Sequence, residues 1–190
     1  MLPVAPPIYK PNPVKKLLRT YLLERTLWSI PRTADVMDLC CGYGFYFTIN
    51  PHARGVDGDP KAVTELRERG YSVAQANVLE GLPFASASFD YVVAHDVFEH
   101  FVFDELVVLT REIHRVLRPN AVLAVWVPNR RGYDLGVRNG SGHRLYVTGA
   151  EIERLIGPSF ALEKQYAEPL PRLVGRFFDH NKEVFILRRR

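Results

Sequence analysis

Short apolar runs alternate with amphipathic segments along the middle of the chain. The short runs predict β-strands at residues 36–39, 53–56, 72–75, 89–94 and 121–127. Helical spacing of the apolar residues between these runs predicts helices at residues 61–69 and 103–117. Strands that alternate with helices are typical of an α/β protein, in which helices cover a mostly parallel sheet.

The amino-terminal part of the chain has a different pattern. Residues 1–13 are rich in proline, which predicts an extended arm. Residues 14–30 carry apolar side chains at helical spacing, and Pro31 ends that run. We therefore expect an arm followed by an amphipathic helix before the first strand.

A segment rich in Gly and Arg follows the strand at residues 121–127. We expect a long loop at residues 129–142, a short helix near residues 150–156, and two final strands at residues 160–166 and 183–187. Loops of this length are uncommon in compact domains unless they are mobile or functional. The loop is therefore a candidate part of a site.

The composition indicates a single globular domain that spans residues 1–190, with 47% apolar and 24% charged residues. No apolar run approaches the roughly 20 residues that cross a bilayer, so we expect a cytoplasmic protein with no membrane partner. The net charge of +4 fits either a solvated surface or attraction for an anionic substrate. Cys40 and Cys41 are adjacent, which disfavours both a disulfide framework and a structural zinc site.

The first candidate motif is the turn after the strand at residues 36–39. Asp38 lies in this strand, and Gly42 and Gly44 follow it closely. Glycine permits positive φ and close approach of the backbone to a ligand. At the carboxyl end of a first strand, beside the switch point of an open α/β sheet, such a turn favours an adenosine-type ligand. A plain turn capped by Asp38 is the alternative.

The second candidate motif is an acidic strand end. Asp57 closes the run at residues 53–56 and precedes Gly58. A carboxylate at this position can accept hydrogen bonds from both ribose hydroxyls. Asp59 is better placed to cap the following helix, with Pro60 at the first helical position. Asp57 is therefore the strongest single candidate for a ligand contact.

Several ordered motifs make residues 36–155 similar to the class I S-adenosylmethionine-dependent methyltransferases. Besides the two motifs above, the similar segments are residues 77–84, 88–93, 97–100 and 111–120. The resemblance implies a Rossmann-like three-layer sandwich, with a mostly parallel seven-stranded sheet and a C-terminal antiparallel hairpin. It also implies S-adenosylmethionine as the cofactor, and methyl transfer as the activity.

The resemblance also assigns cofactor contacts residue by residue. Asn77 matches a position near the adenine amino group, and the backbone of Val78 lies beside the ring in that family. His95 matches a position that lines the methionine part of the cofactor. The residues expected to contact the cofactor are Asp38, Cys40, Gly42, Gly44, Asp57, Gly58, Asn77, Val78 and His95.

Two features depart from the family pattern. Cys40 stands where the family usually has glycine, so the turn must accommodate a side chain. Only a dozen residues separate Gly44 from Asp57, which limits the first crossover helix to about two turns.

A cluster of polar residues follows the strand at residues 89–94. Helical spacing would place Asp96, Glu99 and His100 on one face, and His143 could reach them from the long loop. The spacing resembles the acidic-x-x-Glu-His pattern of magnesium-dependent O-methyltransferases. Because magnesium prefers oxygen ligands and two of these four residues are histidines, we expect no metal here. His143 is the candidate catalytic base and His100 the second candidate; surface or packing histidines are the alternative.

We expect the acceptor to be a small molecule that is methylated at oxygen or carbon. A non-catalytic S-adenosylmethionine-binding module and an RNA 2′-O-methyltransferase are the alternatives, so a nucleic-acid partner stays open. A nicotinamide dehydrogenase is disfavoured, because Phe47 stands where its third fingerprint glycine would be.

Overall fold

A computed structural model describes residues 30–168, 170, 172–177 and 181–190. The predicted arm at residues 1–13 lies outside this part of the chain. So does the predicted helix at residues 14–30, except for its last residue, Ile30, which is buried. Within the described residues, no helix combines the length and apolar character that crossing a membrane requires.

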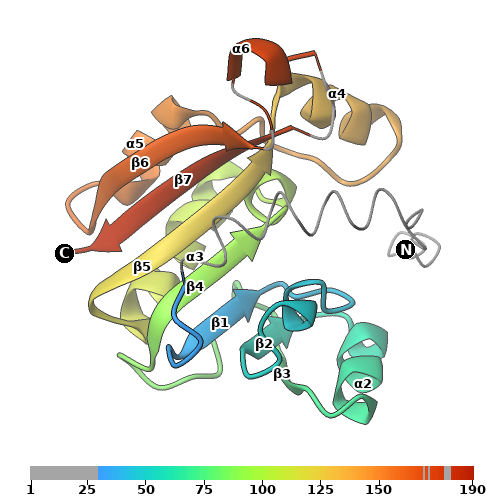
Figure 1. Cartoon of the computed structure of the whole chain (residues 1–190), viewed down its shortest axis with the longest axis vertical. Helices are drawn as coiled ribbons and strands as arrows, with labels where there is room; N and C mark the ends of the chain where they lie inside the picture. The colour runs from blue at the N-terminus through green and yellow to red at the C-terminus, as the bar shows by residue number, and fades with distance from the viewer. Residues whose placement is uncertain (1–29, 169, 171, 178–180) are drawn as a thin grey trace.

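The described chain forms one seven-stranded sheet with the strand order β3-β2-β1-β4-β5-β7-β6 (Figure 1). Strands β1 to β5 are parallel, and β7 runs antiparallel between β5 and β6. The strands are β1 (Val36–Leu39), β2 (Arg54–Asp57), β3 (Ser72–Gln75), β4 (Phe89–His95), β5 (Leu117–Pro128), β6 (Phe160–Glu168) and β7 (Lys182–Arg189). This confirms the expected mostly parallel sheet with an antiparallel C-terminal hairpin.

Apolar residues fill both faces of the sheet. Successive side chains of a strand point to opposite faces, and Val125 and Trp126 of β5 accordingly belong to different apolar clusters. One cluster includes the buried side of α3 (Phe103–Val116) and α5 (Gly149–Ile156). The other includes α2 (Pro60–Glu68) and the short 3-10 helix η1 (Tyr46–Thr48). The sheet is thus covered on both faces.

The start of α2 follows the sequence-based expectation. The Asp59 side chain accepts a hydrogen bond from the Lys61 backbone N–H at 2.9 Å, and Pro60 occupies the first turn. Asp59 is therefore the N-cap, as expected. The first crossover is even shorter than expected, since η1 provides only one 3-10 turn between β1 and β2.

The prediction of a loop at residues 129–142 is wrong for the first part of this segment, which forms the helix α4 (Arg130–Arg138). The Asn129 side chain caps this helix by accepting a hydrogen bond from the Gly132 backbone N–H at 2.9 Å. Arg130 and Asp134 also pair one turn apart along the helix. The sequence pattern did not predict this helix, because its stability comes from the cap and from tertiary contacts, and less from the intrinsic helix propensity of its residues.

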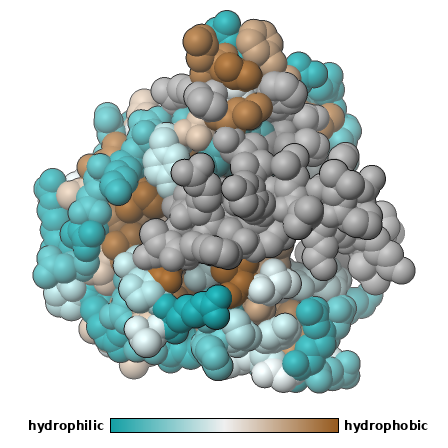
Figure 2. Space-filling view, viewed as in Figure 1, coloured by the Kyte–Doolittle hydropathy of each residue, from teal (hydrophilic) through white to brown (hydrophobic). Residues whose placement is uncertain are grey.

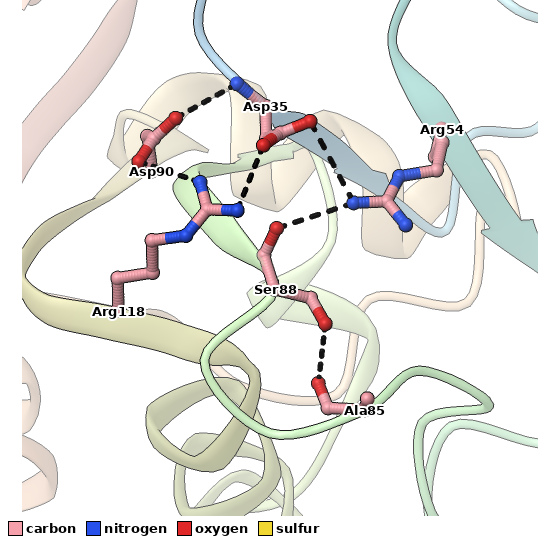
Figure 3. A network of polar contacts seen from close by, with 6 residues as sticks. All are labelled: Asp35, Arg54, Ala85, Ser88, Asp90 and Arg118. Atoms are coloured by element: carbon pink, nitrogen blue, oxygen red, sulfur yellow. Dashed lines mark hydrogen bonds and ion pairs between the residues drawn. The ribbon is translucent and has the colours of Figure 1, made fainter.

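The amino ends of four neighbouring strands are joined by a polar network (Figure 3). Arg118 donates hydrogen bonds to Asp90 and to Asp35, both at 2.8 Å. Arg54 donates to the Ser88 carbonyl at 3.2 Å. Because these residues lie at or just before the starts of β1, β2, β4 and β5, the network holds these strands in register at the end of the sheet opposite to their carboxyl ends.

A patch of exposed apolar side chains lies at one tip of the molecule, over α6 (Arg172–Gly175) and the turn after it (Figure 2). Its members are Leu173, Val174 and Phe177, which are exposed by 72%, 48% and 59%. In Figure 1 this tip lies beside α4, and the Asn129 side chain, which caps α4, donates a hydrogen bond to the Gly175 carbonyl at 3.0 Å.

Candidate active site

The carboxyl ends of β1, β2 and β4 meet at the point where the strand order reverses. From β1 the chain proceeds outward to β2 and β3, and it then returns to place β4 on the other side of β1. In open α/β sheets, ligands bind in the crevice beyond the carboxyl ends of the strands at such a switch point.

The turn that follows β1, residues 40–44, is called the glycine turn below. Cys40, Gly42 and Gly44 all have positive φ, of 50°, 50° and 82°. A Cβ atom on Gly44 would lie 2.5 Å from Leu66 of α2, so this glycine permits close packing of the turn on the helix. A Cβ atom on Gly42 would meet nothing within 4 Å among the described residues. Gly42 therefore faces space that no described residue fills, as a residue beside a ligand should.

Cys40 explains why glycine suits this position. A left-handed conformation costs a residue with a Cβ atom roughly 1–2 kcal/mol, and Cys40 adopts it. Its side chain packs against the apolar core. Burial, with the nearby carboxylates of Asp57 and Asp38, raises the pKa of the Cys40 thiol far above its usual range. Cys40 is thus a protonated, packed side chain and not a nucleophile.

Asp57 connects the end of β2 to the glycine turn. Its Oδ2 accepts a hydrogen bond from the Gly42 backbone N–H at 2.7 Å, and its Oδ1 accepts one from the Asp59 backbone N–H at 2.8 Å. Each carboxylate oxygen has a second lone pair, so the group can still accept hydrogen bonds from a ligand. Sequence reasoning predicts Asp57 as a ligand contact but misses this structural role.

Asp38 lies buried beneath the glycine turn. Burial, together with the negative charge of Asp57, raises its pKa well above the usual value for a carboxyl group. A protonated Asp38 can donate a hydrogen bond, which an ionised one cannot.

The segment after β3 joins Asp57 through the backbone. The Ala76 N–H donates to the Asp57 carbonyl at 3.0 Å, which places the two strand ends side by side. The Asn77 side chain closes its own turn, since its amide donates to Glu80 at 2.8 Å and its oxygen accepts from the Leu79 N–H at 3.2 Å. Val78, which follows Asn77, is buried, whereas Gly58, which follows Asp57, is exposed.

His95, the last residue of β4, lies on the other side of β1. Its ring centroid is 5.7 Å from that of Phe45 and 6.1 Å from that of Trp126. Its Nδ1 lies 3.5 Å from an oxygen of Asp96. His95 is therefore held between aromatic rings at the edge of the switch point.

Asp96 does not share a helical face with Glu99 and His100, contrary to expectation. It has a φ of 56°, and only Phe98–His100 form a 3-10 helix, η2. The reason is that the Asp96 backbone N–H donates to the Trp126 carbonyl at 3.0 Å, which extends the sheet by one residue. The Asp96 carboxylate pairs with the ammonium of Lys182, the first residue of β7, and it also lies beside Glu99. The sequence carried no signal for Lys182, because the last strand was expected to start one residue later.

Glu99, His100 and His143 come together and are called the histidine cluster below. One potential ligand atom from each residue lies within 4.8 Å of those of the other two. The backbone N–H groups of Arg144 and Leu145 donate to the Glu99 carbonyl at 2.7 and 3.2 Å. These bonds tie the segment that carries His143 to η2, so His143 lies in the cluster while remaining partly exposed.

The electrostatics of the histidine cluster favour neutral groups. Burial, followed by the charge of Asp96, raises the pKa of Glu99 to about 8. Burial, followed by the nearness of His143, lowers the pKa of His100. At neutral pH, His100 is therefore an unprotonated imidazole.

The tautomer of His143 follows from one contact. Its Nδ1 lies 3.2 Å from the Tyr133 carbonyl oxygen, which can only accept a hydrogen bond. In the neutral ring Nδ1 therefore carries the proton, and Nε2 is the nitrogen that can accept a proton or bind a cation.

The comparison with protein families matches the part of the chain that holds most of these residues. The model of a family described as a methyltransferase domain matches residues 37–125. This range includes the glycine turn, Asp57, His95 and His100. It ends before His143, whose position depends on α4 and the segment after it.

Curated proteins and solved structures agree with that match. A probable S-adenosylmethionine-dependent methyltransferase from Mycobacterium tuberculosis is 37% identical over 108 residues, which are 54% of this chain and 38% of that protein. The chain thus spans less than half of that relative's length. A protein from Pyrococcus horikoshii has a TM-score of 0.71 at 20% identity, over 98% of this chain and 97% of that one. A methyltransferase structure from Archaeoglobus fulgidus, described as dependent on the same cofactor, has a TM-score of 0.69 at 13% identity, over 92% and 94%. These two structures share the fold.

Proposed function

The chain belongs to the class I S-adenosylmethionine-dependent methyltransferases, and we propose that it transfers the methyl group of this cofactor to an oxygen or carbon atom of a small molecule. The observation that carries the proposal is the carboxylate of Asp57. It holds the glycine turn at the switch point while keeping lone pairs for a ligand.

The residues at the switch point fit the cofactor. Asp57 would accept hydrogen bonds from the ribose hydroxyls, and the open space at Gly42 admits the ligand against the backbone. Asn77 and Val78 follow β3, where the adenine would lie, and His95 would line the methionine part. When bound, the cofactor would supply a methyl group carried on a sulfonium, with the acceptor bonding to the methyl carbon in line with the departing sulfur.

His143 and His100 are proposed as the residues that act on the acceptor. An attacking hydroxyl or acidic carbon must lose a proton, and an unprotonated imidazole at neutral pH can take it. In the neutral ring of His143, Nε2 is the nitrogen that would take the proton, and the lowered pKa of His100 keeps that ring neutral. Both rings are partly exposed, so a small molecule from solvent can reach them.

The test combines cofactor retention with methyl transfer. Mass spectrometry of the denatured protein should detect S-adenosylhomocysteine carried through purification. Incubation with methyl-labelled S-adenosylmethionine and a small-molecule cell extract should then give labelled small molecules, and His143→Ala should reduce the labelling by about 100-fold or more. The exposed His52 provides the control variant His52→Ala, which should label as the wild type does.

Two results would contradict the proposal. Binding of the cofactor without any transfer to small molecules or RNA would favour a non-catalytic binding module. In a parallel incubation with RNA in place of the extract, label that enters RNA and no small molecule would favour the 2′-O-methyltransferase alternative.

A further inference from the structure

Lys182 brings a cation to the carboxyl ends of the strands from a distant part of the chain. It is the first residue of β7, and it lies outside residues 37–125, which the family model matches. In the sheet, Lys182 pairs with Pro128 of β5 on one side and with Glu168 of β6 on the other. Sheet pairing therefore fixes the backbone from which this ammonium reaches the site.

The Lys182 side chain is largely buried and ends on an acid. The side chain is 19% exposed, and its ammonium pairs with the Asp96 carboxylate, whose side chain is 30% exposed. A lysine is seldom removed this far from water without a partner, because its charge is costly to desolvate. Solvent screens a partly buried pair less than a surface pair, so the loss of either partner leaves an uncompensated charge.

Asp96 lies between three polar side chains. Besides its pairing with Lys182, its Oδ2 lies 3.5 Å from Nδ1 of His95, on the cofactor side of the site. On the acceptor side, its carboxyl group is hydrogen-bonded to that of Glu99. Asp96 thus links the two halves of the site, and Lys182 is the cation that holds it there.

The ammonium determines which of the two acids carries a proton. Two carboxyl groups in contact do not readily ionise together, so one of them keeps its proton. Lys182 stabilises the ionised form of Asp96 by direct contact, whereas burial raises the pKa of Glu99 to about 8. At neutral pH, Glu99 is therefore the protonated member and donates its proton to Asp96 in a hydrogen bond. One carboxylate and one ammonium then balance, and the group as a whole is neutral.

This balance acts on the imidazole of His100. The described groups that face its ring are His143 after α4, Asp96 and Glu99 after β4, Lys182 of β7 and the Gly142 backbone. The His143 ring fits there because α4 has a glycine beside it: a Cβ atom on Gly136 would lie 2.0 Å from the ring. An unbalanced carboxylate near an imidazole favours the imidazolium, whereas an ammonium opposes it. Lys182 therefore favours the unprotonated form of His100.

We propose that Lys182 is a positioning residue of this methyltransferase: it holds the Asp96 carboxylate in place and balances its charge, so that His100 stays an unprotonated base at neutral pH. The inference rests on the proposed function, in which His100 acts on the acceptor. It extends that function by giving the C-terminal hairpin of β6 and β7 a part in the reaction. The alternative is an ion pair that only fastens the end of β4 to the start of β7.

Titration of the His100 ring, followed by NMR, tests the proposal without any turnover. The full chain is used, and the His100 signal is assigned by its absence from His100→Gln. Lys182→Met keeps an aliphatic stem but loses the charge, so the midpoint should move to higher pH by about half a unit or more. Lys182→Arg keeps the charge and should restore most of the wild-type midpoint. Lys164→Met removes the same charge from an exposed position in β6, and should leave the midpoint unchanged.

Asp96→Asn tests the other end of the pair. Asparagine tolerates the positive φ of 56° at this position, so the backbone conformation can be kept. Loss of the carboxylate leaves the ammonium unbalanced, and the His100 midpoint should move to lower pH. The double variant Asp96→Asn/Lys182→Met lacks both charges, so its midpoint should return close to that of the wild type. A pair that only fastens two strands would lower the melting temperature without shifting the midpoint in opposite directions.

The pH profile of methyl transfer gives a second readout. Transfer of label from methyl-labelled S-adenosylmethionine to the small molecules of a cell extract is measured across a range of pH. The acid limb of the profile reports the protonation of the base. It should move to higher pH in Lys182→Met, in step with the NMR midpoint, and should return in Lys182→Arg.

The outcomes distinguish this inference from the proposed function. An unchanged His100 midpoint in Lys182→Met would overturn the inference, and so would shifts of the same sign in Lys182→Met and Asp96→Asn. If Lys182→Met does not fold, Asp96→Asn decides alone, and an unchanged midpoint in that variant overturns the inference. Failure of the wild type to bind S-adenosylmethionine or to transfer its methyl group would instead overturn the proposed function, while the NMR midpoints still measure the coupling of Lys182 to His100.

Discussion

The two ends of the same strands carry polar groups in opposite situations. At the amino ends, Asp35, Asp90 and Arg118 are partly exposed and paired with one another (Figure 3). At the carboxyl ends, Asp38 and Glu99 are buried and have raised pKa values. The same sheet thus has one end where ionisation is stabilised and one where it is opposed.

Backbone conformation does not divide the two ends in this way. Cys40 and Asp96 follow β1 and β4 at the carboxyl edge with positive φ, but Ala87 and Asn120, near the amino ends of β4 and β5, also adopt positive φ. Ionisable groups with shifted pKa values concentrate at functional sites. The electrostatic difference therefore indicates that the amino end stabilises the fold, whereas the carboxyl end is arranged for a ligand.

Asp57→Ala should have the largest effect, on cofactor binding. The substitution removes charge-assisted hydrogen bonds to the ribose, and it removes the acceptor that holds the Gly42 N–H. We therefore expect a loss of about 2 kcal/mol in binding free energy, which raises the dissociation constant by about 30-fold. Calorimetry measures it. The control is Asp59→Ala, which removes only the helix cap and should bind normally. Equal affinities in the wild type and Asp57→Ala would remove Asp57 from the site.

Asp90→Asn should lower stability at the amino end without affecting cofactor binding. Burial raises the pKa of Asp90, but hydrogen bonds from Arg118 and the Asp35 backbone lower it by more, so the net shift is downward. Its contribution is therefore present above the unfolded pKa near 3.9, and is lost as pH falls through the folded pKa. After allowance for solvent screening, we expect a loss of about 0.5–1 kcal/mol at pH 7.

Denaturant melts at several pH values check this prediction. The difference between wild type and Asp90→Asn should shrink as pH falls below about 4. A difference that grows in acid, or a loss of cofactor affinity in the variant, would break the proposed division between the two ends.

Asp38→Asn should show the opposite pH dependence. The folded pKa of Asp38 is raised, so above the unfolded value the folded state retains a proton that the unfolded state has lost. Stability of the wild type should therefore decline as pH rises above about 4, and Asp38→Asn should remove part of that decline. Melts at pH 5 and pH 8 compare the two proteins, and an unchanged slope would show that Asp38 is ionised in the fold.

Cys40→Gly should have the smallest effect. It relieves the left-handed strain, but it removes a packed side chain and adds freedom to the unfolded chain, so stability should change by less than about 1 kcal/mol. Cofactor affinity should be equal or stronger, because the backbone can approach the ligand more closely. A large loss of affinity would show that the Cys40 side chain contacts the cofactor itself.

The strands show how far the hydrophobic pattern determines the fold. The bounds of β1 and β3 agree with those expected from the sequence, because each is a short run with clear ends. Strand β5 starts at Leu117, four residues before its expected start. Leu117 pairs with Phe89, and the register shifts between Phe89 and Tyr91, while Asn120 adopts positive φ between the two paired parts of the strand.

The candidate site was predictable only in part. Asp57 and the glycines occur at spacings that have a local physical reason, so the sequence alone identifies them. The approach of His143 to Glu99 depends on Gly136 and on hydrogen bonds from Arg144, which are tertiary contacts with no periodic signal. The pairing of Asp96 with Lys182 likewise joins residues 86 positions apart.

The most direct test of the account is a calorimetric titration of the wild-type chain with S-adenosylmethionine and, separately, with NAD. Both ligands carry an adenosine that a glycine turn and an acidic strand end could hold, so the comparison tests the family assignment and not merely nucleotide binding. The account predicts micromolar affinity for S-adenosylmethionine and much weaker binding of NAD. Tighter binding of NAD, or no heat with S-adenosylmethionine, would contradict it.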